Sequence, residues 1–76
     1  MIKIYSTPTC IYCKYAKEFF KKNNIEYTDL NVAEDEKARE EMISKSQQMG
    51  VPVIDIYGKL VVGFDQRKIE ELLNLK

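Results

Sequence analysis

The two cysteines of this 76-residue chain, Cys10 and Cys13, are separated by two residues, and the sequence contains no histidine. The pair follows a short apolar run and precedes a stretch with helical periodicity. A Cys-x-x-Cys pair at a strand-to-helix junction is typical of reversible thiol–disulfide exchange. The pair therefore predicts a fold that opens with a strand and a helix, with a thiol presented where they join.

The length and charge of the chain exclude several classes of protein. Its 76 residues predict one domain, residues 1–76. Twelve basic and twelve acidic residues cancel, so bulk charge does not favour nucleic-acid binding. The apolar runs are shorter than the roughly 20 residues of a membrane span, and the first residues lack a signal-peptide pattern. We therefore expect a cytoplasmic monomer with no membrane or nucleic-acid partner.

The periodicity of the chain predicts alternating strands and helices. Strands are expected at residues 1–6, 25–32, 53–57 and 60–63, and helices at 11–22, 34–46 and after Asp65. Asp65 is a suitable N-cap for the last helix, and Gly58-Lys59 is expected to form a two-residue hairpin turn. The first two strands need a right-handed crossover and are therefore parallel. One mixed sheet covered by helices follows.

The first predicted helix carries an apolar stripe. Five residues recur at helical spacing and are expected to face the core: Tyr12, Tyr15, Ala16, Phe19 and Phe20. In the later helices, the expected inward residues are Ala38, Met42, Ile43, Ile69, Leu72 and Leu73.

The position of the cysteine pair divides the work between the two thiols. Cys10 is expected just before the first helix, where unpaired backbone N–H groups and the helix dipole stabilise a thiolate, the reactive form. Lys14 and Lys17 either add positive charge there or extend into water. Cys13 falls one turn further along and is expected to be shielded. We therefore assign Cys10 as the attacking nucleophile and Cys13 as the resolving thiol.

Two other uses of the pair are less favoured. A structural disulfide that closes so short a loop would constrain the unfolded chain little. A zinc site normally needs four ligands, so two thiolates without histidine would have to recruit carboxylates or a second chain. We expect thiol chemistry and no metal.

Three segments together resemble the glutaredoxin family: residues 5–13, Gly50-Val51-Pro52 and Val62-Gly63-Phe64-Asp65. The likeness covers essentially the whole chain. It implies an α/β thioredoxin-like fold, β-α-β-α-β-β-α, whose four-stranded mixed sheet has the order 2-1-3-4 and is flanked by three helices. It also implies a cis Val51–Pro52 bond against the cysteines, whereas local sequence alone predicts trans, because only about 5–6% of X-Pro bonds are cis.

The resemblance further implies a glutathione-dependent disulfide oxidoreductase, with glutathione as co-substrate and disulfide-containing or glutathionylated proteins as partners. Cys10 would form the mixed disulfide. The implied glutathione contacts are Tyr12, Val51, Pro52, Gly63, Phe64 and Asp65. The Val51 backbone would pair with the bound cysteinyl residue, and the Asp65 carboxylate would lie near the glutathione amino group. The alternatives are core packing for Tyr12 and helix capping alone for Asp65.

The chain departs from the family pattern near this site. Thr7 and Gln48 stand where basic residues are usual or common, Ile11 replaces a proline and Gly50 replaces a threonine. Loss of two positive charges would weaken capture of the glutathione glycyl carboxylate, because charged hydrogen bonds contribute more than neutral ones. Lys45 and Lys14 are the candidates to replace them.

Two further hypotheses follow from these departures and from the family. One is a glutaredoxin-like redoxin that thioredoxin reductase reduces. The other belongs to a different class: a dimer that carries a [2Fe–2S] cluster, with one thiolate from each chain and two glutathiones. The presence of Cys13 argues against the carrier, which is commonest where the second cysteine is absent.

Overall fold

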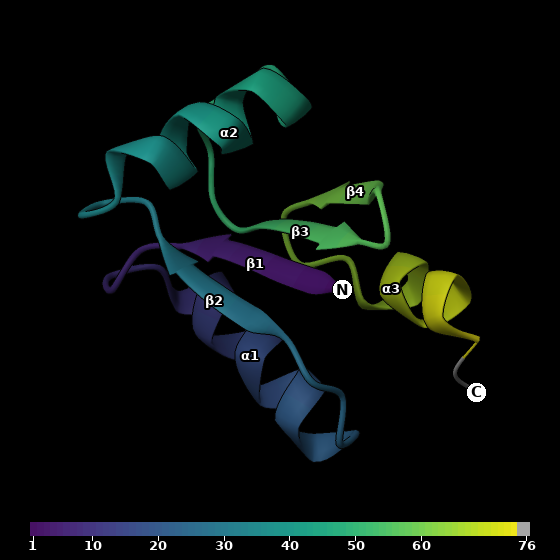
Figure 1. Ribbon diagram of the computed structural model, residues 1–76. Coiled ribbons are helices and arrows are strands. Elements are labelled where there is room, and N and C mark those ends of the chain that lie inside the picture. Colours follow the sequence, from purple (N-terminus) through teal and green to yellow (C-terminus); the bar gives the residue numbers. More distant parts are fainter. Residues whose placement is uncertain (75–76) are drawn as a thin grey trace.

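The computed structural model describes residues 1–74 and contains one sheet and three helices (Figure 1). The strands are β1 (Ile2–Ser6), β2 (Thr28–Asn31), β3 (Val53–Ile56) and β4 (Lys59–Val62). The helices are α1 (Ile11–Lys22), α2 (Glu36–Ser46) and α3 (Gln66–Leu73). The sheet order is β2-β1-β3-β4, with β1 and β2 parallel and the other pairs antiparallel. The predicted fold and strand order are confirmed.

Helices cover both faces of the sheet (Figure 1). On the face covered by α1 and α3, the core includes Ile4, Phe20, Ile54 and Ile69. On the other face, α2 contributes Ala38 and Met42, which pack with Tyr5, Val32 and Val53. Neighbouring residues of β1 and β3 thus point to opposite layers, as the pleat of a strand requires. None of the helices in residues 1–74 is long and apolar enough to cross a membrane.

The apolar stripe of α1 differs from the predicted one. Cys13, Ala16 and Phe20 are buried, whereas Tyr12 is 60% exposed and Tyr15 is 44% exposed. The buried residues recur at intervals of three and four, and a shift of one position turns a side chain by about 100° around the helix. Tyr12 and Tyr15 therefore lie beside the buried stripe, and their predicted core positions are wrong.

Two predicted boundaries also shift. Pairing in β2 begins at Thr28, because Ile25 instead uses its N–H to bond the carbonyl of Phe20 at 2.9 Å and closes the end of α1. The hairpin turn is Tyr57-Gly58 and not Gly58-Lys59, since Lys59 pairs with Ile56. Both turn residues have positive φ, 51° and 92°, which matches the twist of a tight hairpin.

A polar network joins α2 to the sheet. The Lys45 ammonium lies 2.9 Å from Asp55 Oδ2 and 3.2 Å from the Tyr5 hydroxyl, and that hydroxyl donates to Glu41. The N–H of Gly58 donates to Asp55 Oδ1 at 2.8 Å. Asp55 is buried, and it has a partner on each carboxylate oxygen.

The network shifts the pKa values of its members. Burial alone would raise the pKa of Asp55, but hydrogen bonds from Lys45 and from the Gly58 N–H outweigh it and hold that pKa below its usual value. The hydrogen bond from Tyr5 lowers the pKa of Glu41. Burial, followed by the bond to Glu41, raises the pKa of Tyr5. Both carboxylates are therefore held in the charged form near neutral pH.

Candidate active site: a cysteine pair at one edge of the sheet

Strand register gathers the predicted site residues at one edge of the sheet. Tyr5, near the end of β1, pairs with Val53, the first residue of β3, and Val53 also pairs with Val62, the last residue of β4. The segment after β1 carries the cysteines, the segment before β3 carries Val51-Pro52, and the segment after β4 carries residues 63–65. Three segments that are far apart in sequence therefore lie next to one another at this edge of the sheet.

The cysteines occupy the start of α1 as predicted. Cys10 is the N-cap, and its sulfur accepts the N–H of Cys13 at 3.1 Å. The two form a disulfide, with Cα atoms 5.2 Å apart. Cys10 is half-buried, whereas Cys13 is only 1% exposed. The two sulfurs therefore differ both in access and in contact with the helix terminus.

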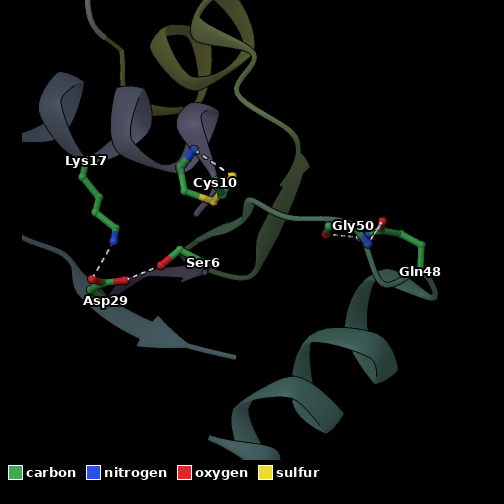
Figure 2. The surroundings of a disulfide bond; sticks show 7 residues. Ser6, Cys10, Lys17, Asp29, Gln48 and Gly50 are labelled. Atoms are coloured by element: carbon green, nitrogen blue, oxygen red, sulfur yellow. Dashed lines mark hydrogen bonds and ion pairs between the residues drawn. A yellow bond between two sulfur atoms is a disulfide. The ribbon is translucent and has the colours of Figure 1, made fainter. Parts of the chain in front are cut away.

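A polar group that the sequence did not reveal lies beside the disulfide (Figure 2). The buried Ser6 hydroxyl donates to Asp29 Oδ1 at 2.7 Å, and the Lys17 ammonium lies 2.8 Å from Asp29 Oδ2. Figure 2 shows Lys17 extending from α1 toward Asp29, with Ser6 on the same side of the disulfide. The one available signal was the spacing of Lys17 four residues after Cys13, which places both on one helix face.

The loop before β3 contains the cis Val51–Pro52 bond that the resemblance implied. Pro52 is buried, and its carbonyl accepts the N–H of Gly63 at 2.7 Å. Val51 is half-buried and packs against the core cluster beneath α2. The cis-proline loop and the turn after β4 are thus bonded directly to each other.

Gln48 and Gly50, which both depart from the family pattern, contact each other in this loop. The side-chain amide of Gln48 accepts the Gly50 N–H at 2.6 Å and donates to the Gly50 carbonyl at 3.1 Å (Figure 2). It also donates to the Ser46 hydroxyl at 3.1 Å. A Cβ atom at residue 50 would lie 2.8 Å from the Gln48 oxygen. The absence of a side chain at Gly50 therefore lets Gln48 fold back on its own loop.

The turn after β4 leads directly into α3. Gly63 has a φ of 83°, in the region that favours glycine. The Phe64 ring packs edge-on against Phe19 of α1, with centroids 5.9 Å apart. The Asp65 carboxylate accepts the N–H of Lys68 at 3.2 Å, so its predicted role as N-cap is confirmed. One oxygen of this exposed carboxylate makes the cap.

The two lysines considered as replacements for the missing positive charges differ. Lys45 is held by Asp55 and Tyr5 beneath α2. Lys14 is exposed and lines a groove with Thr7 and Cys10. Of the two, Lys14 is the one at the cysteine site. Within residues 1–74, no three or more Cys, Asp or Glu side chains cluster in a way that would hold a metal ion.

The fold and the Cys-x-x-Cys pair, in which Cys10 is half-buried and Cys13 is buried, define a thioredoxin-like thiol oxidoreductase. A single-site variant of the thioredoxin-like protein BC3987 has the same fold, with a TM-score of 0.93, 35% identity, and coverage of 99% of this chain and 96% of the other. The glutaredoxin family model matches residues 2–61. The chain belongs to the glutaredoxin family.

Two relatives show how the chain compares within that family. An uncharacterized glutaredoxin-like 8.6 kDa protein in the rubredoxin operon of Clostridium pasteurianum is 58% identical over 73 residues, which cover 96% of this chain and 97% of the relative. Glutaredoxin 3 of Escherichia coli strain K12 is 33% identical over 64 residues, which cover 84% of this chain and 77% of that protein.

Proposed function

We propose that this protein reduces disulfides through the Cys10 thiolate and is itself reduced by glutathione. The thiolate attacks one sulfur of the substrate disulfide, forms a mixed disulfide and releases the first substrate thiolate. Cys13 loses its proton and attacks the Cys10 sulfur, which releases the second substrate thiolate. Two electrons have then passed to the substrate, and Cys10–Cys13 is oxidised. Two glutathione molecules restore the dithiol and leave as glutathione disulfide.

The observation that supports this order is the difference between the two sulfurs. Cys10 caps the helix and is reachable, and its sulfur already accepts a backbone N–H. A hydrogen bond from an N–H at a helix start favours the thiolate over the thiol. Cys13 is buried, so a substrate disulfide meets Cys10 first. Cys13 is suited to intramolecular attack on the mixed disulfide.

Glutathione would lie along the three segments at the sheet edge. Tyr12 lies two residues after Cys10 and is exposed, so its ring is available to flank the ligand, and the alternative that it is a core residue is wrong. The Val51 main chain beside Pro52 would pair with the cysteinyl residue like an added strand. Gly63, Phe64 and Asp65 would receive the γ-glutamyl end, where the exposed Asp65 carboxylate offers a partner for its ammonium group.

Single-cysteine variants test the assignment. For Cys10→Ser we expect loss of both disulfide reduction and removal of glutathione from glutathionylated protein. For Cys13→Ser we expect loss mainly of the dithiol route, because a second glutathione can resolve the mixed disulfide at Cys10. Both reactions are followed by NADPH consumption in the presence of glutathione and glutathione reductase. Normal turnover by the Cys10→Ser protein would show that the order of the thiols is wrong.

A second candidate function is that of a redoxin reduced by thioredoxin reductase. The supporting observation is that Gln48 is folded onto its own loop and Lys45 is held by Asp55, so neither extends toward the cysteines. Parallel NADPH assays, one with glutathione and its reductase and the other with thioredoxin reductase, separate the two functions. Activity only in the second assay would remove the glutathione roles of Tyr12, Val51 and Asp65 and leave the thiol chemistry in place.

A further inference from the structure

An open groove of about 420 Å³ runs from the reactive cysteine along α1. Thr7, Pro8 and Cys10 lie at one end of it. The α1 side chains that line it are Lys14, Lys17, Glu18 and Lys21. The groove thus connects the sulfur that exchanges with substrate to a row of charged side chains on one helix.

The free charge along this groove is positive. Lys17 is neutralised by its ion pair with Asp29, and Glu18 offsets part of the remainder. Lys14 and Lys21 are exposed and form no ion pair within residues 1–74. α1 carries four lysines and one glutamate, whereas charges cancel over the whole chain. Net positive charge is therefore concentrated on α1, the helix that Cys10 caps.

We propose that this groove binds an acidic segment of a protein substrate while the disulfide of that substrate reacts at Cys10. The inference rests on the proposed thiol–disulfide exchange and names the class of substrate that the site prefers. Exposed charges of this kind accelerate encounter with an oppositely charged partner more than they tighten the final complex. The partner is a protein because the reaction requires a disulfide, which a nucleic acid does not supply, and because the groove reaches from Cys10 to Lys21, further than a tripeptide such as glutathione extends.

The spacing of the lysines along α1 predicts where acidic residues should stand in the substrate sequence. Lys14 is four positions after Cys10 and Lys21 is seven positions after Lys14, so the spacings along the helix axis are about 6 Å and about 10 Å. An extended peptide advances about 3.3 Å per residue. The preferred substrate therefore carries acidic side chains about two and about five positions from its reacting cysteine.

Single-turnover kinetics with the reduced protein test this preference without any reductase. Three peptide disulfides differ only at the second and fifth positions on both sides of the cysteine, which are Asp, Ser or Lys. Oxidation of the Cys10–Cys13 pair is followed by rapid acid quench and thiol alkylation. At low salt we expect the Asp peptide to react about fivefold faster than the Ser peptide, since each exposed charge pair contributes modestly. In high salt the preference should disappear, because salt then screens charges that lie more than a few ångströms apart.

Neighbouring lysines at the end of α1 provide a matched control. Lys21→Gln should reduce the ratio of the Asp-peptide rate to the Ser-peptide rate by about half. The double variant Lys14→Gln with Lys21→Gln should react equally fast with both peptides. Lys22→Gln, one residue further on and outside this groove, should leave the ratio unchanged. Equal rates for the Asp and Ser peptides at low salt, or equal effects of Lys21→Gln and Lys22→Gln, would overturn the acidic preference alone. Failure to oxidise the pair with all three peptides would instead refute the proposed function.

Discussion

Replacement of Lys45 by methionine should destabilise the protein more than replacement of other exposed residues on α2. The substitution keeps the aliphatic stem but removes the ammonium group 2.9 Å from Asp55. The Asp55 side chain is only 10% exposed and would keep the Gly58 N–H as its remaining partner from the network. Breaking a buried pair by removing one partner costs about 3–5 kcal/mol. The Lys45 side chain is 34% exposed, and solvent screening reduces the expected cost to about 2–3 kcal/mol.

The cost of Lys45→Met should depend on pH in a defined direction. The folded protein holds the pKa values of Asp55 and Glu41 below their usual values. The stability that they contribute is therefore present above the unfolded pKa, near 4, and is lost as the pH falls through the folded pKa. Without Lys45, burial dominates and Asp55 protonates more readily. Because Asp55 binds its proton at a higher pH in the variant than in the unchanged protein, the difference in stability between them should shrink as the pH falls from 7 to 3.

Urea unfolding of the oxidised proteins at pH 7 and pH 3, followed by circular dichroism, measures both effects. Lys37→Met is the control, because Lys37 lies on the same helix, is exposed and forms no ion pair within the described residues. The reasoning is refuted if Lys45→Met costs no more than Lys37→Met at pH 7. It is refuted equally if the cost does not decrease at pH 3.

Two further substitutions test the role of Asp65 in glutathione binding and the fit between Gly50 and Gln48. Asp65→Asn should leave the free energy of unfolding within about 0.5 kcal/mol, since Asn is an equally good N-cap, but should raise the KM for glutathione several-fold; Asp65→Ala should also lose about 1 kcal/mol. An unchanged KM in the Asn variant would limit Asp65 to capping. Gly50→Thr should cost about 1–2 kcal/mol in urea unfolding, because its Cβ displaces the Gln48 amide. The cost should fall in a Gln48→Ala background, whereas simple additivity would contradict the coupling.

Features set by local pattern could be predicted from the sequence. The position of Asp65 before α3 follows from capping preferences, and that of Cys10 before α1 follows from the helical periodicity that begins at residue 11. The parallel β1–β2 pair follows from the need for a crossover. The sheet order and the cis bond at Pro52 came from the family resemblance, since local sequence alone favoured trans.

Features that depend on how the elements pack were missed. Lys17–Asp29 and Lys45–Asp55 join residues on different elements, and nothing in the spacing of either pair specifies the contact. Tyr12 and Tyr15 match an apolar stripe by periodicity, but α1 buries the neighbouring stripe of Cys13, Ala16 and Phe20 and leaves both tyrosines exposed. Aromatic side chains fit either environment, so their pattern could not distinguish a core residue from one exposed beside the cysteines.

The common origin of the three site segments at one sheet edge also determines how the site opens. Ser6 accepts the N–H of Val32, and Pro52 accepts the N–H of Gly63, so each segment begins at a hydrogen-bonded strand end. Local opening of the site must therefore break bonds shared with the sheet. The amide hydrogens of Val32 and Gly63 should therefore exchange more slowly than those of loop residues without such bonds. We therefore expect the core to resist proteolysis equally in the oxidised and the reduced protein.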